Sequence, residues 1–201
     1  MTRRCSTFCL FLIASFFSLQ ASGSSQGEFF DRLKLLCGQA FAGKMTHFSR
    51  PSDNGWLDVD VVMHVRECSE DEIRIPLHVG DNRSRTWVVS RESDRLRLKH
   101  DHRHEDGNED AVTWYGGHTT DPGRPWRQTF PVDDYSRALF IANGLEPSIE
   151  NFWSMEVRPG DRFAYEMVRS RRLFRAEFDL SQPVDAPPDP WGAQQSIAGN
   201  E

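Results

Sequence analysis

The sequence predicts an all-β protein: an antiparallel up-and-down β-barrel of about ten strands with a short N-terminal helix. Apolar and polar residues alternate with a period of two over several short runs, as in strands covered on one face. Turn residues such as Asp106-Gly107-Asn108 separate these runs and favour hairpins. About ten hairpin-connected strands must also hide their sheet edges, so a closed barrel is favoured, with a sandwich as the alternative.

The first residues have the features of a secretory signal peptide. Arg3 and Arg4 precede an apolar run over residues 9–17, and small residues follow up to Gly23. The run is too short to span a membrane comfortably. We therefore expect cleavage of residues 1–23 and a secreted or periplasmic mature protein with no membrane span. An uncleaved anchor is the alternative.

Cleavage would leave two of the four cysteines, Cys37 and Cys68. In an oxidising compartment two cysteines most simply form one disulfide, here between the first helix and an early strand. Two buried free thiols are the other interpretation. A zinc site is disfavoured because neither cysteine belongs to a Cys-x-x-Cys element.

The mature chain is expected to begin with one helix and to continue with strands. Phe29, Phe30 and Leu33 gather on one side of residues 28–37, and Gly38 follows, where a helix often ends. The clearest alternating runs are residues 57–66, 73–80, 95–99 and 173–180. Further strands are expected at residues 39–46, 85–90, 111–117, 127–130, 152–157 and 163–169. Residues 133–143 suit a helix or a strand, and we favour a helical turn followed by a strand.

The chain is organised as a single domain with a tail. Residues 24–181 contain all the predicted strands and form one barrel domain, which suits a chain of 201 residues. Four prolines and several polar residues follow. Residues 182–201 are therefore expected to be a solvated, Pro-rich, disordered tail.

The start of the barrel resembles a known superfamily. A helix, the segment Leu36-Cys37-Gly38-Gln39-Ala40-Phe41-Ala42-Gly43 and an up-and-down series of strands resemble the calycins, which are lipocalin-type and fatty-acid-binding-type barrels. The resemblance spans most of the mature chain. It implies a barrel that holds a small ligand. The chain also resembles a family of exported bacterial proteins, and that resemblance implies no function.

Three of the seven histidines, His100, His102 and His104, occur at a spacing of two. On a strand this spacing puts them on one face, with neighbours about 6.6 Å apart along the backbone. Two such neighbours suit one metal ion, and a third ligand would come from across the hairpin. A three-residue turn ending at Asn108 keeps one apolar face and places His104 opposite Asp110. His102, His104 and Asp110 are therefore the predicted ligands of a divalent metal.

Two other interpretations of the histidine cluster remain open. The simpler one is a solvated or hydrogen-bonded face, compensated by the neighbouring acids Asp101, Glu105, Asp106, Glu109 and Asp110. The other is proton-transfer catalysis, since histidine suits this role as well as metal binding.

The numerous aromatic side chains fill the barrel core or line a cavity within it. For a cavity, we expect His100, Trp114, Trp87 and Tyr165 to contact the ligand. The sequence has no Gly-x-Ser-x-Gly elbow, no His-Glu-x-x-His motif, no phosphate-binding loop and no dinucleotide fingerprint. Its formal net charge of -6 argues against nucleic acid as a partner.

These observations favour an exported, non-catalytic protein that binds a small apolar or amphipathic ligand. A metal or polar ligand site is expected on the hairpin over residues 100–110. One alternative is an enzyme that uses His100 or His102 at the barrel mouth as a general acid or base. The other is a structural envelope protein with an unknown partner. The sequence indicates no cofactor other than a divalent metal, and it does not indicate an oligomeric state.

Overall fold

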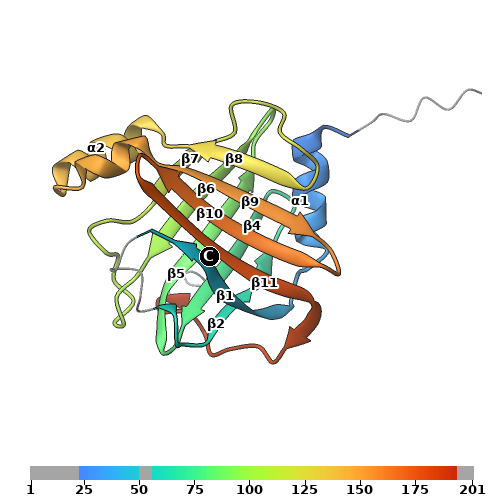
Figure 1. Ribbon diagram of the computed structural model, residues 1–201. Helices are drawn as coiled ribbons and strands as arrows, with labels where there is room; N and C mark the ends of the chain where they lie inside the picture. The colour runs from blue at the N-terminus through green and yellow to red at the C-terminus, as the bar shows by residue number, and fades with distance from the viewer. Residues whose placement is uncertain (1–22, 50–55, 194–201) are drawn as a thin grey trace, which may run out of the picture.

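The computed structural model describes residues 23–49 and 56–193. Ten antiparallel strands form a nearly closed barrel in the order β7-β6-β5-β4-β2-β1-β11-β10-β9-β8, and β3 pairs with β4 beside this path (Figure 1). The prediction of an antiparallel barrel of about ten strands with a short N-terminal helix is confirmed. Among the described residues, no helix is both long and apolar enough to cross a membrane. The expected signal peptide lies outside the described residues except for Gly23.

Most elements follow the predicted alternation, but two predicted strands begin later than expected. Strand β2 begins at Val61 rather than at residue 57, and Leu57 and Val59 are exposed; β7 begins at Tyr115 rather than at residue 111. The helices are α1 (Ser25–Lys34), α2 (Asp134–Ala142) and the 3-10 helix η2 (Glu146–Glu150). The first six strands are β1 (Ala40–Phe48), β2 (Val61–His64), β3 (Glu67–Cys68), β4 (Glu72–Val79), β5 (Asn82–Arg91) and β6 (Leu96–His102). The remaining strands are β7 (Tyr115–His118), β8 (Arg127–Pro131), β9 (Phe152–Arg158), β10 (Arg162–Arg169) and β11 (Arg172–Val184). Side chains of alternate residues on these strands fill the barrel interior with one apolar core.

Helix α1 covers one end of the barrel. The Ser24 hydroxyl caps the helix by accepting a hydrogen bond from the Gly27 N–H at 3.0 Å. Phe29, Phe30 and Leu33 are fully buried in the barrel core. Arg91, the last residue of β5, forms an ion pair with Asp31 of the helix and lies over the ring of Phe30. The end of β5 that contains Arg91 is therefore the end that α1 covers.

The predicted disulfide between Cys37 and Cys68 is present, with the two Cα atoms 6.3 Å apart. Cys37 follows α1, and Cys68 ends β3. The bond thus ties the chain that follows the helix to the strand that pairs with β4.

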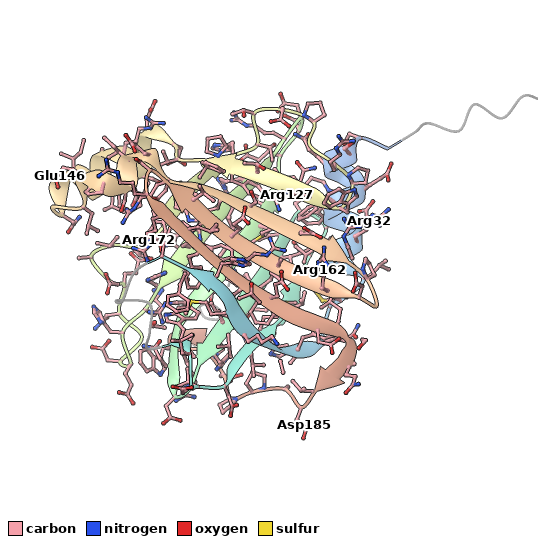
Figure 2. The ribbon with its side chains drawn as sticks, viewed as in Figure 1. Arg32, Arg127, Glu146, Arg162, Arg172 and Asp185 are labelled. Atoms are coloured by element: carbon pink, nitrogen blue, oxygen red, sulfur yellow. A yellow bond between two sulfur atoms is a disulfide. The ribbon has the colours of Figure 1, made fainter. Side chains whose placement is uncertain are left out.

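The outer face of β8 to β11 has a network of ion pairs around one buried carboxylate. Glu156 is only 5% exposed and accepts hydrogen bonds from Arg158 at 2.7 Å and Arg162 at 2.8 Å. Arg127 and Arg175 approach the same carboxylate to within 4 Å. Figure 2 shows Arg127 and Arg162 on this face. Burial alone would raise the pKa of Glu156, but the hydrogen bonds from Arg158 and Arg162 outweigh it and hold the pKa below its usual value.

Two glycines bring together β7 and β8, the strands at the two ends of the sheet order. The Gly116 carbonyl accepts a hydrogen bond from the Asp133 N–H at 2.9 Å, and the Ser136 hydroxyl accepts one from the Gly116 N–H at 2.7 Å. A Cβ atom at Gly117 would lie 1.7 Å from the carbonyl oxygen of Pro131. The backbones approach this closely because Gly117 has no side chain.

Replacing Gly117 with alanine is expected to lower the free energy of unfolding by about 2–3 kcal/mol, because the added methyl group forces β7 and β8 apart. Urea denaturation of the variant and the wild type measures this loss. Gly144→Ala is the control, since a Cβ there meets nothing within 4 Å. It should cost only about 1 kcal/mol for its left-handed backbone. If Gly117→Ala were as stable as the wild type, the contact between β7 and β8 at Gly117 would not be tightly packed.

Residues 133–143 form a helix, and no strand follows within them, so this part of our prediction is wrong. The Asp133 carboxylate caps α2 by accepting a hydrogen bond from the Ser136 N–H at 2.9 Å. Phe140 packs into the barrel core, whereas Ile141 is exposed. The capping interaction and this one-sided burial select a helix over a strand.

The chain stays in contact with the barrel beyond residue 181, where we predicted that the tail begins. Strand β11 continues to Val184. The Asp189 carboxylate pairs with Arg66 at 3.1 Å, and its carbonyl accepts a hydrogen bond from Arg83 at 3.1 Å. Ala193 is buried. Residues 182–193 are thus held on the barrel by outward-facing arginines, which a pattern of apolar residues does not reveal.

Candidate functional site

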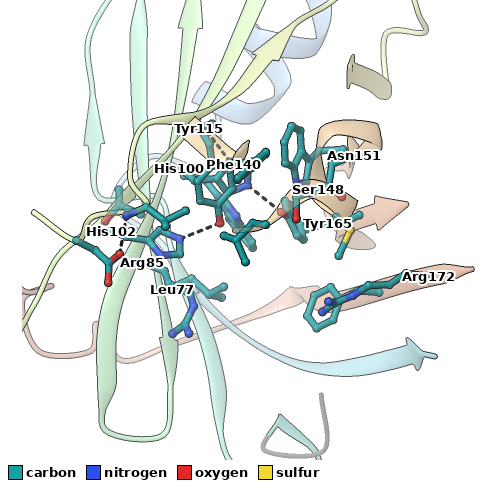
Figure 3. Close-up of a pocket in the computed structure, with 18 of the residues that line it drawn as sticks. Leu77, Arg85, His100, His102, Tyr115, Phe140, Ser148, Asn151, Tyr165 and Arg172 are labelled. Atoms are coloured by element: carbon teal, nitrogen blue, oxygen red, sulfur yellow. Dashed lines mark hydrogen bonds between the residues drawn. The ribbon is translucent and has the colours of Figure 1, made fainter. Parts of the chain in front are cut away.

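A cavity of about 360 Å³ lies in the barrel interior between β4, β5, β6 and the α2–η2 segment (Figure 3). This volume falls within the usual range of small-molecule sites. The apolar and aromatic lining comes from Trp56, Leu77, Trp87, Val112, Tyr115, Phe140, Leu145, Trp153, Tyr165, Met167 and Phe174. The polar lining comes from Arg85, Thr86, His100, His102, Asp110, Ser148, Asn151 and Arg172.

Strand periodicity places the polar residues of β5 and β6 inside the barrel. Arg85 pairs with His102, and Trp87 pairs with His100, in the antiparallel register of the two strands. Residues two apart on a strand share a face, so Arg85 points to the same side as Trp87. Because α1 covers the Arg91 end of β5, Arg85 lies nearer the opposite end of the barrel than Trp87 does.

His100 is buried and fully hydrogen-bonded. Its Nδ1 lies 3.0 Å from the Tyr115 carbonyl oxygen and therefore donates, which leaves Nε2 to accept a hydrogen bond from the Tyr165 hydroxyl at 2.8 Å. The rings of Tyr115 and Trp153 pack on the imidazole at 4.5 and 5.1 Å. Burial lowers the pKa of His100 to about 3, and the neighbouring His102 adds to this effect. His100 is thus a neutral structural element of the cavity wall.

His102 lies beside it at the cavity surface. Its Nε2 is 3.1 Å from the Tyr115 hydroxyl, and the two rings meet edge to face. Burial and the nearby charge of Arg85 lower the pKa of His102 to about 4. Burial also raises the pKa of the Tyr115 hydroxyl to about 12. Both groups are therefore neutral at physiological pH and offer hydrogen bonds rather than charge.

The structure does not bring the predicted metal ligands together. His102 faces the cavity, whereas the side chain of His104 is 59% exposed and its Nε2 lies 3.9 Å from Asp110 Oδ2. Within residues 23–49 and 56–193, no group of three or more His, Cys, Asp or Glu side chains is arranged to hold a metal ion. The reason is local: β6 ends at His102, so His104 no longer follows the alternation of the strand.

The register of this hairpin also differs from the expected one. Trp114 has a left-handed backbone with a φ of 57°. His100 pairs with Tyr115, and nearer the turn Arg103 pairs with Glu109, so His104 does not lie opposite Asp110 as we predicted. The Trp114 indole instead donates a hydrogen bond to Glu109 at 2.8 Å and lies beneath Arg74. Trp114 is therefore not part of the cavity lining.

The other three predicted ligand contacts, His100, Trp87 and Tyr165, do meet in the cavity wall. The rings of Trp87 and Tyr165 stack at 4.5 Å, and Tyr165 bonds to His100. Arg85 and Tyr115 also line the cavity, although the sequence did not lead us to expect them there. One sequence feature could have identified Arg85 as a cavity residue. Arg85 is two residues from Trp87 on a predicted strand and so shares its inward face, where a charged residue is unusual.

No protein-family model, curated protein or solved structure matches this chain. The nearly closed antiparallel barrel is compatible with a calycin-like fold.

Proposed function

We propose that the protein is an exported, non-catalytic binding protein that holds a small amphipathic ligand in the barrel cavity. The observation that carries this proposal is the cavity itself, with aromatic walls and a few convergent polar groups. Such a combination buries the apolar part of a ligand and orients its polar part. The N-terminal sequence pattern and the Cys37–Cys68 disulfide support an oxidising compartment outside the cytoplasm.

The side chains of the cavity wall hold one another in fixed positions. Trp87 and Tyr165 are stacked, and His100 is fixed by two hydrogen bonds. Fixed side chains reduce the entropy lost on binding. Each Å² of apolar surface removed from water contributes about 25 cal/mol, so aromatic walls are an effective source of affinity.

The enzyme alternative has less support from the same residues. A general base works best when its pKa lies near the working pH and is usually oriented by a carboxylate. Burial instead lowers the pKa of His100 to about 3 and that of His102 to about 4. Both ring nitrogens of His100, and Nε2 of His102, hydrogen-bond to tyrosines rather than to a carboxylate.

The proposal is tested with N-phenyl-1-naphthylamine, a neutral apolar probe that fluoresces when it leaves water. The wild type is expected to bind it, and Val112→Trp, which fills the cavity from the hairpin, should weaken binding by about tenfold or more. Val184→Trp is the matched control, since Val184 is exposed on β11 outside the cavity. Circular dichroism confirms that both variants fold.

Equal binding of this probe by the wild type and Val112→Trp would rule out the cavity as its binding site. Native mass spectrometry of protein purified from its own compartment adds a second test. It should show a bound small molecule and a mature chain that begins at Ser24. A chain that retains residues 1–23 would contradict export with cleavage.

A further inference from the structure

Arg85 is a cation that faces the cavity with only neutral hydrogen-bond partners. Its Nη1 donates to Asn82 Oδ1 at 2.8 Å and to Ser84 Oγ at 3.2 Å. Its guanidinium carbon lies 5.5 Å from the centre of the Trp56 ring. In the part of the chain that the structure describes, no carboxylate lies within 4 Å of the Arg85 guanidinium. Figure 3 shows the side chain among the residues of the cavity wall.

Asp110 also lines the cavity, but its carboxylate serves the hairpin. One oxygen accepts a hydrogen bond from the Val112 N–H at 2.7 Å, and the other lies 3.9 Å from His104 Nε2. The Asp110 carboxylate acts on Arg85 through space and tends to raise the pKa of the guanidinium, but among the described residues the two groups form no ion pair within 4 Å.

Six arginines outside the cavity pair directly with carboxylates: Arg74, Arg103, Arg127, Arg158, Arg162 and Arg175. Arg83 and Arg137 instead donate hydrogen bonds to main-chain carbonyl groups. Arg85 differs from both groups because it lines the cavity. Withdrawing a cation from water is costly unless an anion compensates it. Burial accordingly lowers the pKa of Arg85. The guanidinium nevertheless stays protonated, since arginine does not lose its proton in proteins.

We infer that the ligand carries one anionic group, such as a carboxylate or sulfonate, which binds Arg85. The planar guanidinium suits such groups because it can donate two parallel hydrogen bonds. The apolar body of the ligand then extends toward Trp87 and Tyr165, which lie further along the barrel toward α1. This inference rests on the proposed function and specifies the chemical class of the ligand.

Two fluorescent probes that share one skeleton test the inference. 1-Anilinonaphthalene-8-sulfonate is N-phenyl-1-naphthylamine with an added sulfonate. The wild type should bind the sulfonate more tightly than the neutral probe. Arg85→Met keeps an apolar stem without the charge, and it should weaken sulfonate binding by about tenfold or more relative to its effect on neutral-probe binding. Arg124→Met, at an exposed loop position outside the cavity, is the matched control.

Each outcome points to one conclusion. Equal binding of the two probes by the wild type, or equal weakening of both by Arg85→Met, would overturn the anionic ligand and leave the binding cavity intact. Binding of neither probe would overturn the proposed function itself. If Val112→Trp did not reduce sulfonate binding, the probe would bind outside the cavity, and the role of Arg85 would also be overturned.

Discussion

Lowering the pH from 7 to 4 is expected to reduce the free energy of unfolding by several kcal/mol, because three buried histidines stay neutral in the folded barrel. The folded-state pKa is about 4 for His78, about 3 for His100 and about 4 for His102. An unfolded histidine titrates near 6.5. The unfolded chain therefore takes up protons first as the pH falls. The stability from the neutral histidines is complete above pH 6.5 and is lost progressively down to about pH 4 to 3.

The slope of this loss is measurable by urea denaturation at a series of pH values. Each histidine contributes up to about 1.4 kcal/mol per pH unit within its window. His78 is 4% exposed and its Nε2 has no hydrogen-bond partner among the described residues, so His78→Leu should remove about one histidine's share of the slope. Val88→Ala, at a buried position of β5, should lower stability without changing the slope. A wild-type slope in His78→Leu would contradict the assignment.

Replacing both Cys37 and Cys68 with serine is expected to lower the free energy of unfolding by about 3–4 kcal/mol. The bond joins residues 31 apart in the sequence, and its loss gives the unfolded chain more conformations. Thermal and urea denaturation of the variant measure the difference. Reductant should bring the wild type to the stability of the variant and should leave the variant unchanged. Equal stabilities of oxidised wild type and variant would contradict a stabilising disulfide.

The fold was largely predictable because one-sided burial imposes a period of two on each strand. Leu96 and Leu98 of β6 and Phe174, Ala176 and Phe178 of β11 are all buried, as the alternation indicated. The helix and the disulfide were predictable for similarly local reasons: a cap residue with an apolar stripe, and two cysteines in a chain with export features.

Other features depend on contacts that no local pattern contains. The backbone of Trp114 adopts a left-handed conformation that bulky residues rarely take, and its indole lies against Glu109 and Arg74 rather than in the cavity. His104 does not lie beside His102 as the predicted metal site requires, because β6 and its alternation end at His102. Asp189 holds the C-terminal segment through Arg66 and Arg83, which are distant in sequence.

The candidate site was predictable in composition but not in electrostatics. His100, Trp87 and Tyr165 were expected to meet, and the barrel geometry brings them together. The neutrality of His100 follows from its complete burial, which depends on Tyr115 and Trp153 from other strands. The importance of Arg85 depends on which carboxylates lie near it, and only the three-dimensional structure gives that information.

The contact between β7 and β8 at Gly116 and Gly117 is where the barrel is most easily opened. These strands are at the two ends of the sheet order. One main-chain hydrogen bond, from Asp133 to Gly116, links this part of the barrel, whereas other neighbouring strands are joined by a ladder of such bonds. Separating them therefore breaks fewer hydrogen bonds than parting any other pair of neighbours. Tyr115 belongs to β7 and lines the cavity, so a small hinge-like opening of this contact would widen the site.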